Sequence, residues 1–102
     1  MPKVPKKVAE NAFRALELRK TFKYGGTEVG IAMAKRIVKA YEENRGLTFK
    51  HVKKISEYFP MHANDNLSYT LPPSKGLIAW LLWGGDEGWK WSKAEVEKVK
   101  GN

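Results

Sequence analysis

The residues best suited to hold a phosphate group lie together near one glycine pair. Thr27 is a typical N-cap residue, so a helix is expected to begin after it, and the free backbone N–H groups at a helix start attract phosphate. Glycine before such a start lets a phosphate come close to the backbone. The negative charge of Glu28 counts against phosphate binding at this turn. The lysines at the end of the preceding helix also have another explanation, because cations there complement the helix dipole. The candidate phosphate-binding turn comprises Lys20, Lys23, Tyr24, Gly25, Gly26 and Thr27.

Basic side chains recur at helical spacing in two further stretches. Lys50 is about one helical turn from both Lys53 and Lys54, and like charges at that spacing repel each other and weaken an isolated helix. A polyanion on this face would offset the repulsion, although a solvated face is an equally good explanation. Lys90 and Lys93 flank a tryptophan whose ring could stack on a base. The further candidate DNA contacts are Lys35, Lys39, Thr48, Lys50, Lys53, Lys54, Lys90 and Lys93.

The overall charge agrees with a polyanionic partner. The chain of 102 residues has 19 Lys and Arg against 11 Asp and Glu, a net charge of +8. Such a surplus on a small domain favours nucleic acid first and an anionic membrane second, with ordinary solubility as the alternative. No expected helix opposes a basic face to a large exposed apolar face, so we do not expect a membrane partner.

Catalysis is not expected. There is no cysteine, which excludes disulfides, thiolate metal sites and cysteine nucleophiles. Neither of the two common glycine-rich phosphate motifs is present. His62 and Asp65 are spaced to pair with each other, but two residues do not make a metal site. We therefore expect a protein that is not an enzyme and has neither a cofactor nor a metal.

Hydrophobic periodicity predicts an all-α fold, a compact bundle of four to five short helices. The range 1–5, with two prolines, is expected to form an extended arm, and 6–100 a single helical domain. The turn-rich range 60–74 is expected to be one long loop, because Pro60 should end the helix before it. The last helix begins either at Asp86 or at a capping box that starts at Ser92. The other helices are expected at 6–24, 28–43, 49–59 and 75–83.

The apolar run 77–83 is expected to form a central buried helix. It is too short to span a bilayer, which takes about 20 apolar residues. We expect Trp80 and Trp83 in the core and a sharp corner at the following Gly-Gly-Asp, while Trp91 is the better placed of the last two tryptophans to meet a ligand. Other inward positions are Val29, Tyr41, Phe49, Val96 and Val99.

Two strings of residues are distinctive. They are Gly25-Gly26-Thr27-Glu28-Val29-Gly30 and Ile78-Ala79-Trp80-Leu81-Leu82-Trp83-Gly84-Gly85-Asp86. With the order of residues around them, they resemble a small helical domain that recurs in bacteriophage proteins. That domain is attached to prohead-protease and head-morphogenesis proteins, and a similar one is an N-terminal appendage of some phage ATP-dependent DNA ligases. One departure is Met61, where the family tends to have an arginine before His62.

The resemblance implies an accessory module of phage origin that acts in the cytoplasm of the infected host. In a ligase such a module would hold double-stranded DNA, whereas in a head-assembly or host-takeover protein it could bind another protein. We therefore expect a monomeric DNA-binding module, alone or tethered to a catalytic domain, that contacts backbone phosphates with little sequence specificity. A protein–protein interaction module is the alternative.

Overall fold

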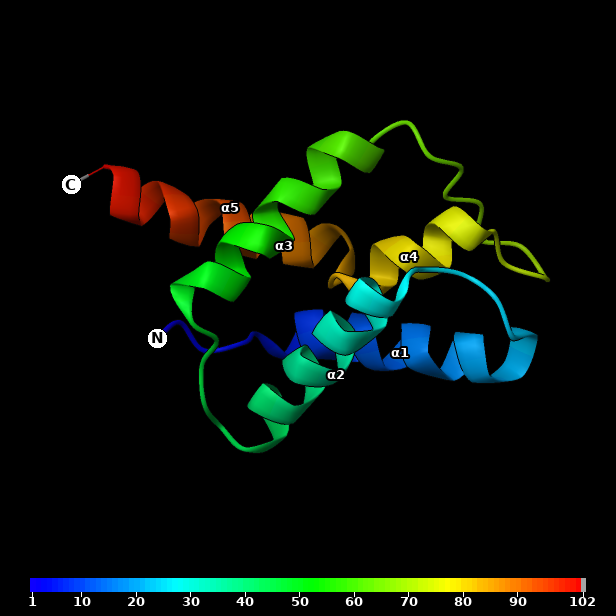
Figure 1. Ribbon diagram of the computed structural model, residues 1–102, viewed down its shortest axis with the longest axis horizontal. Coiled ribbons are helices and arrows are strands. Elements are labelled where there is room, and N and C mark those ends of the chain that lie inside the picture. Colours follow the sequence, from blue (N-terminus) through cyan, green and yellow to red (C-terminus); the bar gives the residue numbers. More distant parts are fainter. Residues whose placement is uncertain (102) are drawn as a thin grey trace.

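The chain folds as a bundle of helices, as predicted (Figure 1). The computed structural model describes residues 1–101, and within that range it contains five α-helices and no strand beyond one isolated bridge. The fold class is therefore all-α. The helices are α1 (Lys6–Phe22), α2 (Glu28–Glu42), α3 (Phe49–His62), α4 (Lys75–Leu82) and α5 (Gly85–Lys100).

Three of the helices begin at the hydroxyl residues that the sequence indicates. The side chain of Thr27 accepts a hydrogen bond from the backbone N–H three residues later, and Thr48 and Ser74 do the same. Each cap satisfies one of the N–H groups that a helix start leaves without a partner. These caps fix where α2, α3 and α4 begin.

The predicted ends of α3 and α5 need correction. Pro60 does not end α3, which continues to His62. Proline removes a single backbone hydrogen bond there, close to the helix end, so the last turn still forms. α5 begins at Gly85, before Asp86, and runs through Ser92, so the capping box does not start the helix.

The N-terminal arm is part of the packed structure. Lys3 forms an isolated antiparallel bridge with Gly46, and the backbone N–H of Leu47 donates to the carbonyl of Pro2 at 3.0 Å. Val4 is buried. The arm therefore covers the connection between α2 and α3.

The five helices pack in two groups around one hydrophobic core. α1 packs against α2, α4 and α5, while α3 packs mainly on α5. α3 reaches α4 through aromatic rings: Phe59 meets Trp80 edge-on at 4.8 Å between ring centroids and stacks on Trp89 at 5.6 Å. Trp80 and Trp83 are buried, as predicted. An aromatic cluster thus joins the two parts of the bundle.

Four of the expected inward positions are instead on the surface. Exposed fractions are 61% for Val29, 40% for Tyr41, 40% for Phe49 and 57% for Val99. Periodicity finds the apolar side of a helix, but neighbouring helices decide how far around that side they reach. Val29 lies at the edge of the buried face of α2, where α2 faces α3 without packing closely on it. Val96, by contrast, is buried as expected.

The corner between α4 and α5 needs glycine. Gly84 and Gly85 have φ angles of 107° and 68°, in the left-handed region that favours glycine. The corner is also tied to α1, because Asn11 Nδ2 donates to the Gly84 carbonyl and to Glu87 Oε1, both at 2.7 Å. The second Gly-Gly pair therefore forms the sharp corner expected after the apolar run.

We expect Gly84→Ala to lower the free energy of unfolding by at least about 2 kcal/mol. A Cβ there would lie 2.8 Å from Val8 Cγ1 and 2.9 Å from Gly88 Cα, in addition to the left-handed φ. Gly101→Ala is the control, since Gly101 is exposed with a φ of −74°. Urea unfolding followed by circular dichroism measures both, and equal midpoints would contradict the account.

Candidate functional site

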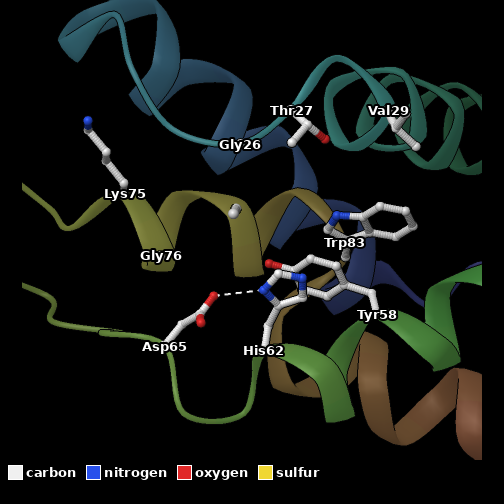
Figure 2. Close-up of a pocket in the computed structure, with 10 residues that line it drawn as sticks. Gly26, Thr27, Val29, Tyr58, His62, Asp65, Lys75, Gly76 and Trp83 are labelled. Carbon is white, nitrogen blue, oxygen red and sulfur yellow. Dashed lines mark hydrogen bonds and ion pairs between the residues drawn. The ribbon is translucent and has the colours of Figure 1, made fainter.

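A hollow lies between the start of α2, the end of α3 and α4 (Figure 2). Its volume is about 420 Å³. It has an apolar side, to which Val29, Ala79 and Trp83 contribute, and a polar side with His62, Asp65 and Lys75. A mainly apolar cavity with a few convergent polar groups is typical of a small-molecule site. The lining is completed by Gly26, Thr27, Tyr58 and Gly76.

Tyr58 is held in the wall of this hollow by two rings. Its ring stacks on His62 at 4.3 Å and on Trp83 at 4.8 Å between centroids, with interplanar angles of 17° and 12°. Its hydroxyl is buried and has no hydrogen-bond partner among residues 1–101. Burial, and then the negative charge of Asp65, raise the pKa of Tyr58 to about 12. The hydroxyl therefore remains protonated at neutral pH and able to donate.

The pairing of His62 with Asp65 is confirmed. His62 Nδ1 lies 2.8 Å from Asp65 Oδ2 across the end of α3. The pair fixes the imidazole over the Tyr58 ring (Figure 2). Throughout the described range 1–101, no three His, Cys, Asp or Glu side chains come together as a metal site would require.

A basic cluster lies on the neighbouring part of α2 and α3. We define it as Arg36, Lys50, His51 and Lys54. The pKa of His51 is lowered, first by burial and then by the positive charges of Arg36, Lys54 and Lys50. Lys50 and Lys54 are exposed and one turn apart on α3, and Arg36 of α2 is near enough to His51 to lower the pKa of its imidazole. The candidates predicted from the sequence include Lys50 and Lys54 but not Arg36, because nothing in the sequence shows that Arg36 of α2 comes near His51 of α3.

The basic cluster and the hollow follow one line along the molecule. Val29 lines the hollow, and Arg36 belongs to the basic cluster. The two residues are seven positions apart and therefore lie on the same side of α2. At 1.5 Å per residue their separation along the helix is about 10 Å. On α3, His51 and Tyr58 are likewise seven residues apart. We call this line, with the cluster at one end and the hollow at the other, the α2–α3 seam.

We expect the pKa of His51 to rise when the protein binds a polyanion. In the free protein its pKa lies below the ordinary value of about 6.5, so the imidazole is neutral at pH 7. A nearby phosphate favours the protonated form of the His51 imidazole, so His51 takes up a proton when DNA binds. DNA binding therefore becomes tighter as the pH falls toward the pKa that His51 has in the free protein. NMR titration of the imidazole with and without duplex measures this, and Arg36→Ala should raise the pKa of the free protein. An unchanged pKa on binding would remove His51 from the interface.

The candidate turn at 25–26 is explained by packing. A Cβ on Gly25 would lie 2.8 Å from Ile78 Cβ, and one on Gly26 would overlap Leu82. Arg19 Nε donates to the Gly25 carbonyl at 2.6 Å, and the Tyr24 hydroxyl donates to the Pro73 carbonyl at 2.5 Å. The glycines therefore let the turn press on α4, and whether the turn also binds phosphate stays a prediction.

The remaining candidates lie at several places around the bundle, and two of them, Lys39 and Lys53, border the basic cluster because each is three residues from one of its members. Lys35 and Lys39 are exposed on the side of α2 opposite the buried Ile37. Lys53 is seven residues from Pro60, which lines a hollow with Lys93 on the α5 side of α3. Lys20 and Lys23 lie at the end of α1, where Lys23 is the left-handed C-cap residue.

The two candidate threonines cap helices, and Lys90 and Lys93 lie on α5. The Thr27 and Thr48 hydroxyls are occupied by their caps, and Thr48 also bonds the His51 ring at 3.1 Å. Lys90 and Lys93 line a shallow hollow with Asp86 and Trp89. Trp91 is half-buried and packed against the core, as Trp89 is. Contact of Trp91 with a ligand remains a prediction.

Comparison of the chain with known protein families, with curated protein sequences and with solved structures finds no match. The resemblance to a phage domain therefore stays a prediction. Among residues 1–101, no helix has the length and apolar content needed to cross a membrane.

Proposed function

We propose that this protein binds double-stranded DNA, mainly through backbone phosphates and with little sequence specificity. The observation that carries the proposal is the basic cluster, in which Lys50 and Lys54 are exposed one turn apart on α3 and Arg36 of α2 lies near the same imidazole, that of His51. Cationic side chains on such a surface can contact backbone phosphates. Contacts of this kind orient a protein on DNA without reading the base sequence. The net charge of +8 adds long-range attraction to a polyanion.

Within this proposal the protein is a monomeric accessory module without a catalytic role of its own. The resemblance to phage domains supports a place beside a catalytic domain, as in the N-terminal appendage of a phage ATP-dependent DNA ligase, in the cytoplasm of the infected bacterium. The basic cluster, rather than all the lysines together, is the surface that contacts DNA.

Fluorescence anisotropy with a labelled duplex of about 20 base pairs, at 50 and 200 mM salt, tests the proposal. We expect micromolar or tighter binding at the lower salt concentration and a fall of at least about tenfold at the higher one, because neutralised phosphates release counterions. No binding at low salt would overturn the proposal and favour the alternative, a protein–protein interaction module.

A further inference from the structure

The hollow at the end of the α2–α3 seam has features that phosphate binding by the basic cluster does not use. The Tyr58 hydroxyl is buried without a partner in the described chain, which costs about 1–3 kcal/mol unless a partner is supplied. Figure 2 shows this hydroxyl turned toward the space between Gly26, Lys75 and His62. Such an unsatisfied donor at a cavity wall calls for an explanation.

The polar groups of the hollow suit a ligand with one anionic group. Lys75 is exposed at the rim and supplies a positive charge, and the protonated Tyr58 hydroxyl supplies a donor. Asp65, which is paired with His62, brings a negative charge to the other side of the hollow, so an anionic group fits beside Lys75 and not beside Asp65. Asp65 remains as an acceptor for an amino group. A phosphate beside Lys75 together with a ring amino group near Asp65 matches this distribution.

The apolar side of the hollow suits the rest of a nucleotide. Val29 is 61% exposed although a valine at this spacing would ordinarily be inside. With Ala79 and the edge of Trp83 it forms an apolar surface against which a sugar or a planar base can lie. The volume of about 420 Å³ leaves room for a single nucleotide and not for a duplex.

The seam connects this hollow to the DNA-binding surface proposed above. The separation of about 10 Å between Val29 and Arg36 along α2 is within the reach of a few nucleotides of one strand. A strand whose phosphates lie on Arg36 and Lys54 can therefore place a nucleotide from the same strand in the hollow.

We propose that the hollow binds one unpaired nucleotide, with its phosphate at Lys75 and Tyr58 and its base or sugar against Val29. This inference rests on the proposed function. The nucleotide comes either from a DNA strand, at a bulge, nick or end where pairing is already lost, or from solution as a free nucleotide. Extruding a nucleotide costs least where it is already unpaired.

Val29→Glu is the variant that tests the inference. It puts a negative charge at the rim of the hollow, and an exposed side chain at the start of a helix tolerates glutamate without loss of folding. Val99→Glu is a matched control, because Val99 is 57% exposed and lies in the last turn of α5, away from the hollow. Circular dichroism spectra of both variants are compared with that of the wild-type protein to check that both fold.

Anisotropy titrations compare a fully paired duplex with the same duplex carrying one extra unpaired nucleotide. We expect the wild-type protein to bind the second at least about tenfold tighter. The preference should fall to about twofold or less in Val29→Glu and persist in Val99→Glu, and because it compares two duplexes in one variant, a general loss of affinity for DNA cancels out. A third titration follows tryptophan fluorescence during addition of free dAMP.

The outcomes separate the inference from the proposed function. Loss of the unpaired-nucleotide preference in Val29→Glu alone supports a strand as the source. No preference, with dAMP binding that Val29→Glu abolishes, supports a free nucleotide as the source. Salt-sensitive duplex binding with neither effect overturns the inference and leaves the proposed function standing. Failure to bind any duplex at low salt overturns both.

Discussion

Replacing Lys50 and Lys54 together by glutamate weakens duplex binding by about 100-fold at 50 mM salt, with the helical content unchanged. Both side chains are exposed and belong to the basic cluster around His51. Reversing the charge of these two side chains removes two favourable interactions with phosphate and adds two repulsive ones on the surface that we propose binds DNA. The slope of log K against log salt should become shallower by about two units, because each neutralised phosphate accounts for about 0.9 of that slope.

The matched control replaces Lys90 and Lys93 together by glutamate. It changes the net charge by the same amount, and Lys93 lies on the other flank of α3, in the hollow with Pro60 and Val96. We expect this variant to bind less than about tenfold more weakly than the parent, through the weaker long-range field alone. Equal effects of the two double variants would show that net charge, and not the basic cluster, governs binding.

Phe59→Ala lowers the free energy of unfolding by about 3–5 kcal/mol. Phe59 is fully buried and contacts Trp80, Trp89 and Tyr58, with centroid distances of 4.8, 5.6 and 5.2 Å. These rings join α3 to α4 and α5, and a domain of this size has about 5–15 kcal/mol of stability in total. The cavity left by Phe59 would therefore remove a large share of that stability.

Phe49→Ala makes the same chemical change on the same helix. Phe49 is 40% exposed, so this variant should be destabilised by about 1 kcal/mol or less. Urea unfolding, followed by tryptophan fluorescence, compares the two variants with the parent. Similar midpoints would mean that the aromatic cluster does not hold α3 on the bundle.

The fold is predictable where local chemistry decides it. The hydroxyl caps at Thr27, Thr48 and Ser74 are sequence signals, and all three begin helices in the structure. The apolar run ending at Trp83 has to be buried, because apolar residues cover every side of that helix. The helix end predicted at Pro60 is wrong, since proline close to a helix end costs little.

The candidate site is less predictable because it depends on how helices lie beside one another. His62 and Asp65 are close in the sequence, so their pairing can be foreseen. The effect of Arg36 on the pKa of His51 cannot be foreseen, because the two residues are on different helices. The sequence places Val29 in the core, since periodicity does not show that α2 and α3 leave a hollow between them.

The central claim is that the basic cluster on α2 and α3 holds the phosphates of double-stranded DNA. An ¹H–¹⁵N correlation spectrum of the protein, recorded during titration with a short duplex at low salt, tests this claim most directly. We predict that the largest shifts fall on the amides of Arg36 and of the range 50–54, with small shifts at Lys90 and Lys93. Shifts confined to the end of α1 or to α5, or none at saturating duplex, would contradict the account.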